Sequence, residues 1–147
     1  MKKLLNKEVI SYLFWGVMTT VVSWGSYAIF SVLLNHLFSD DLLITISNIL
    51  SWICAVAFAF VTNKVWVFGS KSWKLSVWWP ELVKFVLARL LTGVFEMVAV
   101  PLAHKIGLDF TVMGIKGMGA KIIISVVVVI LNYVFSKFLV FDRKKNN

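Results

Sequence analysis

Four long apolar stretches constrain the fold of this chain more than any other feature of its sequence. A helix needs about 20 mostly apolar residues to cross a hydrocarbon core roughly 30 Å thick. The sequence meets this requirement at residues 9–37, 42–68, 81–102 and 120–141. With 60% hydrophobic residues, the chain is too apolar to enclose one core behind a water-facing surface. We therefore predict an all-α polytopic membrane protein with four transmembrane helices in a single membrane domain, 1–147.

The segments between these stretches predict where the helices begin and end. The first stretch follows a basic N-terminus, but it is longer than a signal-peptide core and lacks a small-x-small cleavage site. We therefore expect a retained first helix. The turn FSDD is short, whereas residues 69–79 mix lysine with tryptophan, a composition typical of the headgroup layer. We predict that this second segment is an interfacial loop and that Pro80 opens the third helix.

Lysine and arginine are distributed unequally between the two ends of the predicted helices. Eleven of the 15 fall on one side, namely Lys2, Lys3, Lys7, Lys64, Lys71, Lys74, Lys84, Lys137, Arg143, Lys144 and Lys145. Because cytoplasmic segments are enriched in these residues, we predict a multi-pass protein of the cytoplasmic membrane with both termini in the cytoplasm. The net charge of +8 follows this bias, and nucleic acid is not an expected partner.

The sequence also repeats itself at an offset of 73 residues. Glu8 then aligns with Glu81, and the motif NKVWVF aligns with SKFLVF through Val61, Lys64, Val67, Phe68 and Lys71 on Val134, Lys137, Val140, Phe141 and Lys144. We interpret the chain as two helical hairpins, about 1–73 and 74–147, related as parallel repeats about an axis along the membrane normal. Lys64 and Lys137, next to aromatic residues at the helix ends, are predicted to be interfacial anchors.

The two copies differ in their polar residues at membrane depth. Four polar residues of the second copy, Arg89, Glu96, Lys121 and Asn132, align with Gly16, Ser23, Asn48 and Ala59 of the first. A charge in hydrocarbon costs about 2.5 to 3.5 kcal/mol on insertion scales, so it is rarely kept without a partner or a function. We therefore expect the first hairpin to be a scaffold and the second to carry the site.

Each of these polar residues has a structural and a functional interpretation. Arg89 either pairs with Glu96 or reaches the headgroups, or its forked guanidinium holds a phosphate. Asn132 either makes an interhelical hydrogen bond or completes a polar pocket beside Arg89. Lys121 follows the glycine-rich run GIKGMG, which favours an anion site at a helix N-terminus, although lysine at a helix end is also a common anchor.

Enzymatic motifs are not found in the sequence. His36 and His104 are isolated, and Cys54 is the only cysteine, so neither a disulfide framework nor a thiolate metal site is expected. The chain has no nucleotide-binding loop. We predict that the protein is not an enzyme and uses no cofactor or metal.

Together, these features resemble the GtrA-like family, and within it the members that act in teichoic acid glycosylation. The resemblance rests on four helices, the two [NS]-K-x-x-V-F helix ends, Arg89, and the pair Asn132 and Tyr133. It implies flipping of an undecaprenyl-phosphate-linked monosaccharide across the cytoplasmic membrane, for glycosylation of a surface polymer such as wall teichoic acid. It also implies partners: membrane lipids, and glycosyltransferases on the cytoplasmic and external sides. Four helices can barely enclose a sugar, so we expect a homodimer or higher oligomer, or a groove open to the lipid. The family's polar and aromatic positions map onto Asn63, Val67, Phe68, Phe85, Arg89, Lys121 and Asn132.

Our hypothesis is that Arg89, with Asn132 and Asn63, holds the lipid phosphate and that Lys121 receives it near the external face. No energy-coupling element is visible, so movement would be passive. Two alternatives remain open at this point. One is a small proton-coupled cation exporter that uses Glu96, and the other is a non-transporting assembly subunit of a glycosyltransferase system.

Overall fold

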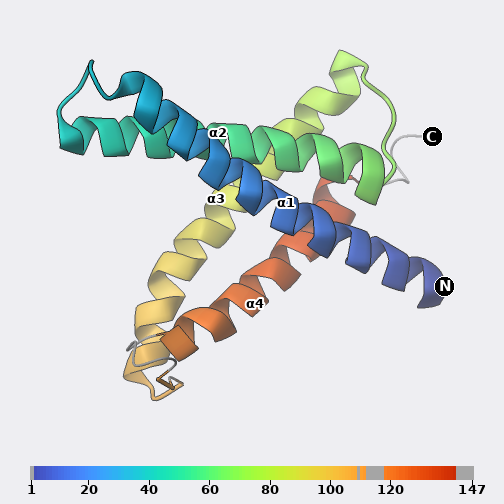
Figure 1. The fold of residues 1–147 in the computed structure, drawn as a ribbon. Coiled ribbons are helices and arrows are strands. Elements are labelled where there is room, and N and C mark those ends of the chain that lie inside the picture. The colour runs from blue at the N-terminus through green and yellow to red at the C-terminus, as the bar shows by residue number, and fades with distance from the viewer. Residues whose placement is uncertain (1, 109, 112–117, 142–147) are drawn as a thin grey trace. The chain divides into compact units, whose positions relative to one another are not determined.

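Four long helices form the structure, which is a computed structural model that describes residues 2–108, 110–111 and 118–141 (Figure 1). In chain order they are α1 (Lys2–Leu34), α2 (Asp40–Thr62), α3 (Leu75–Lys105) and α4 (Met118–Phe135). Short π-helices extend α2 and α4, namely η1 (Asn63–Val67) and η2 (Ser136–Val140). All four spans are long and apolar enough to cross a bilayer. The predicted all-α class with four transmembrane helices is confirmed.

The chain divides into two units, residues 1–71 and 72–147, and each unit is a helical hairpin. In the first, α1 and α2 are joined by a short turn, and Asp40 and Asp41 occupy the first turn of α2, where their charge suits the helix dipole. In the second, α3 packs against α4 and η2. We call the end of each hairpin opposite its interhelical turn the open end. The π-helices lie at these open ends.

The second hairpin begins earlier than the sequence predicts. Helix α3 starts at Leu75, with Lys74 as its N-cap, so Pro80 lies inside the helix and does not open it. Of the predicted loop 69–79, residues 69–74 are non-helical as expected, whereas residues 75–79, with Trp78 and Trp79, form the first turn of α3. The backbone bonds begin at the carbonyl of Lys74, which accepts from the amides of Val77 and Trp78. Pro80 has no amide hydrogen, so it cannot satisfy the carbonyl of Ser76 in the usual helical way.

Large apolar side chains lie mainly on the outside of the helices, whereas α2 buries a stripe of small residues. Along α2, residues Ser47, Ser51, Ala55 and Ala59 are at most 7% exposed and recur every four residues. A stripe of this kind lets a neighbouring helix approach closely, which is how helices associate in lipid without a hydrophobic driving force. The exposed apolar side chains suit contact with lipid tails.

Both open ends are closed by the same local structure. In η1 the amide of Phe68 donates to the carbonyl of Asn63 at 2.9 Å, and in η2 the amide of Phe141 donates to that of Ser136 at 2.9 Å. The ring of Phe68 lies 6.4 Å from that of Tyr12, and the ring of Phe141 lies 6.2 Å from that of Phe85, with interplanar angles of 54° and 50°. Every one of these positions is related by the offset of 73 residues. This is the correspondence that a duplicated hairpin predicts.

Gly119 allows a close contact near the start of α4. Its amide donates to the carbonyl of Phe110 at 3.0 Å, and a β-carbon built on Gly119 would lie 2.5 Å from the backbone nitrogen and oxygen of Phe110. No side chain larger than hydrogen fits there without moving the preceding segment.

We therefore predict that Gly119→Ala destabilises the protein, by about 1 to 3 kcal/mol, because an added methyl group in a closely packed contact forces a backbone shift. Gly93→Ala is the matched control, since Gly93 is helical and has no atom within 4 Å of a built β-carbon. Thermal unfolding in detergent measures both. Equal melting temperatures for the two variants would contradict this account of Gly119.

Candidate functional site

Arg89 lies half-buried on α3, in the second hairpin. The carbon of its guanidinium is 5.0 Å from the centre of the Phe85 ring, one turn earlier on the same helix. Phe85 is itself only 1% exposed and packs against Phe141. The guanidinium thus lies over the face of the Phe85 ring. Its N–H donors, at the edge of the guanidinium, remain available for hydrogen bonding. Among the residues that the structure describes, none accepts a hydrogen bond from these donors.

Glu96 pairs with Lys121 and not with Arg89. The Nζ atom of Lys121 lies 3.6 Å from Oε1 of Glu96, and the hydroxyl of Ser125 approaches the same oxygen at 3.5 Å. Helical side chains lean toward the N-terminus of their helix, so Arg89 points away from Glu96, whose Cα is about 10 Å further along the axis. The predicted alternative in which Arg89 pairs with Glu96 is wrong. Lys121 keeps most of its side chain exposed beside this carboxylate.

Asn132 is brought to the turn of α3 that follows Arg89. The hydroxyl of Thr92 lies 2.9 Å from Oδ1 of Asn132, 3.0 Å from the carbonyl of Ala88 and 3.2 Å from that of Arg89, so its single proton is shared among three acceptors. Both Thr92 and Asn132 are at most 5% exposed. The predicted interhelical hydrogen bond of Asn132 is confirmed. It occupies the amide oxygen of Asn132, and no described residue accepts a hydrogen bond from the amide nitrogen.

The remaining predicted site residues of the first hairpin lie in its π-turn. Asn63, Val67 and Phe68 are 4%, 6% and 3% exposed. The amide nitrogen of Asn63 donates to the carbonyl of Ala59 at 2.7 Å, whereas its Oδ1 is buried without a hydrogen-bond donor among the described residues. Phe68 packs against Tyr12 at this end of the first hairpin, and Phe141 packs against Phe85 at the matching end of the second.

The prediction that Lys64 is an interfacial anchor is wrong. Lys64 is fully buried, and its ammonium donates to the hydroxyl of Ser70 at 2.9 Å. Gly69, with a φ of 64°, turns the chain so that the amide of Ser70 also reaches the carbonyl of Lys64. Its counterpart Lys137 is half-buried and donates to the hydroxyl of Tyr133 at 3.2 Å. The Gly-Ser pair directly after the motif NKVWVF is the sequence feature that indicates this turn of the backbone toward Lys64.

The glycine-rich approach to α4 falls largely outside the described residues, which include neither Gly114 nor Gly117. The amide of Gly119, which is described, donates to Phe110 and so is not offered to an anion. A group of three or more His, Cys, Asp or Glu that could hold a metal ion is not found within 2–108, 110–111 and 118–141.

We predict that Thr92→Val destabilises the second hairpin by about 0.6 to 1.7 kcal/mol, because it removes the donor to Asn132 inside the membrane. The matched control is Thr19→Val at the equivalent position of the first hairpin, where the hydroxyl donates only to the carbonyl of Trp15 in its own helix. Unfolding in detergent measures both changes. A loss for Thr19→Val as large as that for Thr92→Val would show that the interhelical bond contributes nothing.

Comparison with known proteins assigns the fold to a family. The family model described as GtrA/DPMS, transmembrane domain, matches residues 11–141. The chain is 32% identical to the uncharacterized membrane protein YwcD of Bacillus subtilis (strain 168), over 91% of this chain and 96% of that protein. It is 31% identical to the cell wall teichoic acid glycosylation protein GtcA of Listeria monocytogenes serovar 1/2a (strain ATCC BAA-679 / EGD-e), over 94% of this chain and 87% of that protein. No solved structure matches the chain. The chain therefore belongs to the GtrA/DPMS transmembrane-domain family, as its helix ends and Arg89 predicted.

Proposed function

We propose that this protein moves an undecaprenyl-phosphate-linked monosaccharide across the cytoplasmic membrane, for glycosylation of a surface polymer such as wall teichoic acid. Two findings support the class of process: the family, and relatives that carry the name cell wall teichoic acid glycosylation protein GtcA. The observation that carries the mechanism is Arg89, whose guanidinium is held on the Phe85 ring while its edge donors face no described acceptor. A phosphate offers acceptors that match this fork.

Arg89 and Asn132 are proposed to bind the lipid phosphate together. Thr92 links the two, because it bonds Asn132 and lies one turn beyond Arg89 on α3. This bond fixes the side chain of Asn132 and leaves its amide nitrogen to donate to a phosphate or sugar oxygen. Asn63 belongs to the first hairpin and is proposed as a separate contact for the lipid-linked sugar, since its Oδ1 has no donor among the described residues.

Lys121 is proposed to receive the phosphate near the external face. Its pairing with Glu96 means that an arriving phosphate competes with a carboxylate for the ammonium. Such competition favours release, which a passive translocator needs at its exit. This assignment assumes cytoplasmic termini, as the distribution of lysine and arginine indicates. Glycosyltransferases on the two sides would load the lipid and consume it.

The duplicated hairpins are part of this proposal. The matched π-turns and ring pairs support a common ancestor for residues 1–73 and 74–147. The exporter alternative gains no support, because Glu96, its cation site, is already paired with Lys121. In this proposal the protein is not a catalyst, and its glycosyltransferase partners carry out the chemistry.

We predict that Arg89→Ala lowers surface-polymer glycosylation about tenfold or more, since it removes charge-assisted hydrogen bonds to the phosphate. Arg89→Lys keeps the charge but not the fork, so it should restore only part of the activity. Glycosylation is measured in cells that produce the variants in place of the native protein.

Lys105→Ala is the control, because Lys105 is an exposed cation in the last turn of the same helix. Protein levels are matched by membrane immunoblot. Near-normal glycosylation in both Arg89 variants would contradict the phosphate-binding role.

A further inference from the structure

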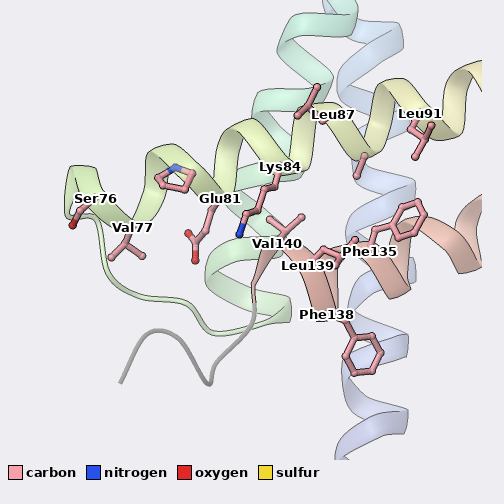
Figure 2. Close-up of a pocket in the computed structure, with 12 residues that line it drawn as sticks. Ser76, Val77, Glu81, Lys84, Leu87, Leu91, Phe135, Phe138, Leu139 and Val140 are labelled. Atoms are coloured by element: carbon pink, nitrogen blue, oxygen red, sulfur yellow. The ribbon is translucent and has the colours of Figure 1, made fainter.

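A groove of about 650 Å³ runs along the open end of the second hairpin, between the N-terminal half of α3 and η2 (Figure 2). Its walls are mostly apolar and include Leu87, Leu91, Phe135 and Phe138. The volume lies within the range of about 300 to 1,000 Å³ that is typical of small-molecule sites. The groove is therefore large enough to hold part of a lipid chain.

The first hairpin carries larger aromatic side chains at two of the equivalent positions. By the offset of 73 residues, two groove residues, Ala88 and Leu139, correspond to Trp15 and Trp66. These two indoles are stacked, with ring centres 4.7 Å apart and an interplanar angle of 13°. The same hairpin frame thus carries a stacked tryptophan pair in one copy, and the small Ala88 with Leu139 beside a groove in the other.

Charge distinguishes the two copies at the polar end of the groove. In Figure 2, Glu81 and Lys84 project from α3 toward η2 at this end. Glu81 has a counterpart in Glu8 and is only 4% exposed, so it belongs to the shared frame and is largely covered. Lys84 is exposed and corresponds to Ser11. The groove therefore offers an added cation next to an added apolar space, which matches an amphiphile with an anionic head.

We propose that this groove is the loading site for the polyisoprenyl phosphate, with the isoprenoid chain between α3 and η2 and the phosphate at Lys84. The proposal rests on the proposed function and adds to it a place and a residue. Arg89 follows Lys84 by five residues, about 7 to 8 Å along the helix axis and about 140° around it. It is the next cation of α3 but lies outside the groove lining, so the phosphate would have to leave the groove to reach it. At the equivalent positions of the first hairpin, the stacked Trp15 and Trp66 stand in place of Ala88 and Leu139.

Photolabelling tests the proposal on the full-length protein in vesicles of phosphatidylethanolamine and phosphatidylglycerol. The probe is an undecaprenyl phosphate analogue with a diazirine in its chain, and labelled residues are mapped by mass spectrometry. We expect labels at Leu87, Leu91 and Phe138. Excess undecaprenyl phosphate should compete, and additional phosphatidylglycerol should not. Labels spread evenly over lipid-facing residues, or equal competition by phosphatidylglycerol, would overturn the proposal.

The tryptophan pair of the first hairpin suggests the decisive variant of the second. Ala88→Trp with Leu139→Trp should lower groove labelling about fivefold or more, since the rings occupy the space of the chain. Leu90→Trp with Ala99→Trp is the control, because neither residue lines the groove. Unchanged labelling in the folded Ala88 and Leu139 double variant would contradict the proposal.

Lys84→Ser provides a second variant that does not depend on tolerance of the tryptophans, because Lys84 is exposed. It should remove the advantage of undecaprenyl phosphate over undecaprenol as a competitor. An intact advantage would exclude Lys84 as the phosphate residue. Labelling requires binding and no translocation, so groove labelling without headgroup movement would contradict the proposed function alone. Translocation with labels elsewhere would contradict the groove alone.

Discussion

Polar and charged groups inside a membrane must find partners within the protein, and this requirement governs the structure of both hairpins. Lys64 is buried against the Ser70 hydroxyl, and Thr92 pairs with Asn132. Glu96 and Lys121 neutralise one another between α3 and α4. Arg89 is one exception, besides the Oδ1 of Asn63, because an aromatic face holds it while its hydrogen-bonding edge meets no acceptor in the described part of the chain. An arginine left in this state at membrane depth is costly unless a ligand uses it.

The two hairpins show how one frame can serve two purposes. The π-turns and the ring pairs of Phe68 and Phe141 recur at matching positions and close both open ends. The two copies then differ in the side chains that the frame carries: stacked tryptophans in the first copy, and smaller residues beside a groove with Lys84 at its polar end in the second. This asymmetry fits the proposal that the first hairpin supports and the second binds.

Much of this architecture could be predicted from the sequence, because span length and hydrophobicity are local properties. The four spans, the family and the contrast between hairpins at Arg89 and Asn132 are of this kind. Pro80 was misplaced because a helix can begin before a proline that usually marks its start. Pairing partners were harder to predict. The choice of Lys121 for Glu96, and of Ser70 for Lys64, depends on side-chain direction and on a turn at Gly69, neither of which hydropathy records.

We propose that the protein itself moves a lipid-linked sugar and uses Arg89 to do so. The most direct measurement is the rate at which the headgroup of an undecaprenyl-phosphate-linked sugar becomes exposed in liposomes that contain only the purified protein. We predict a rate well above that of protein-free liposomes for the native chain and for Lys105→Ala, and a rate near the protein-free level for Arg89→Ala. A native rate equal to that of empty liposomes would contradict the account and favour the role of an assembly subunit.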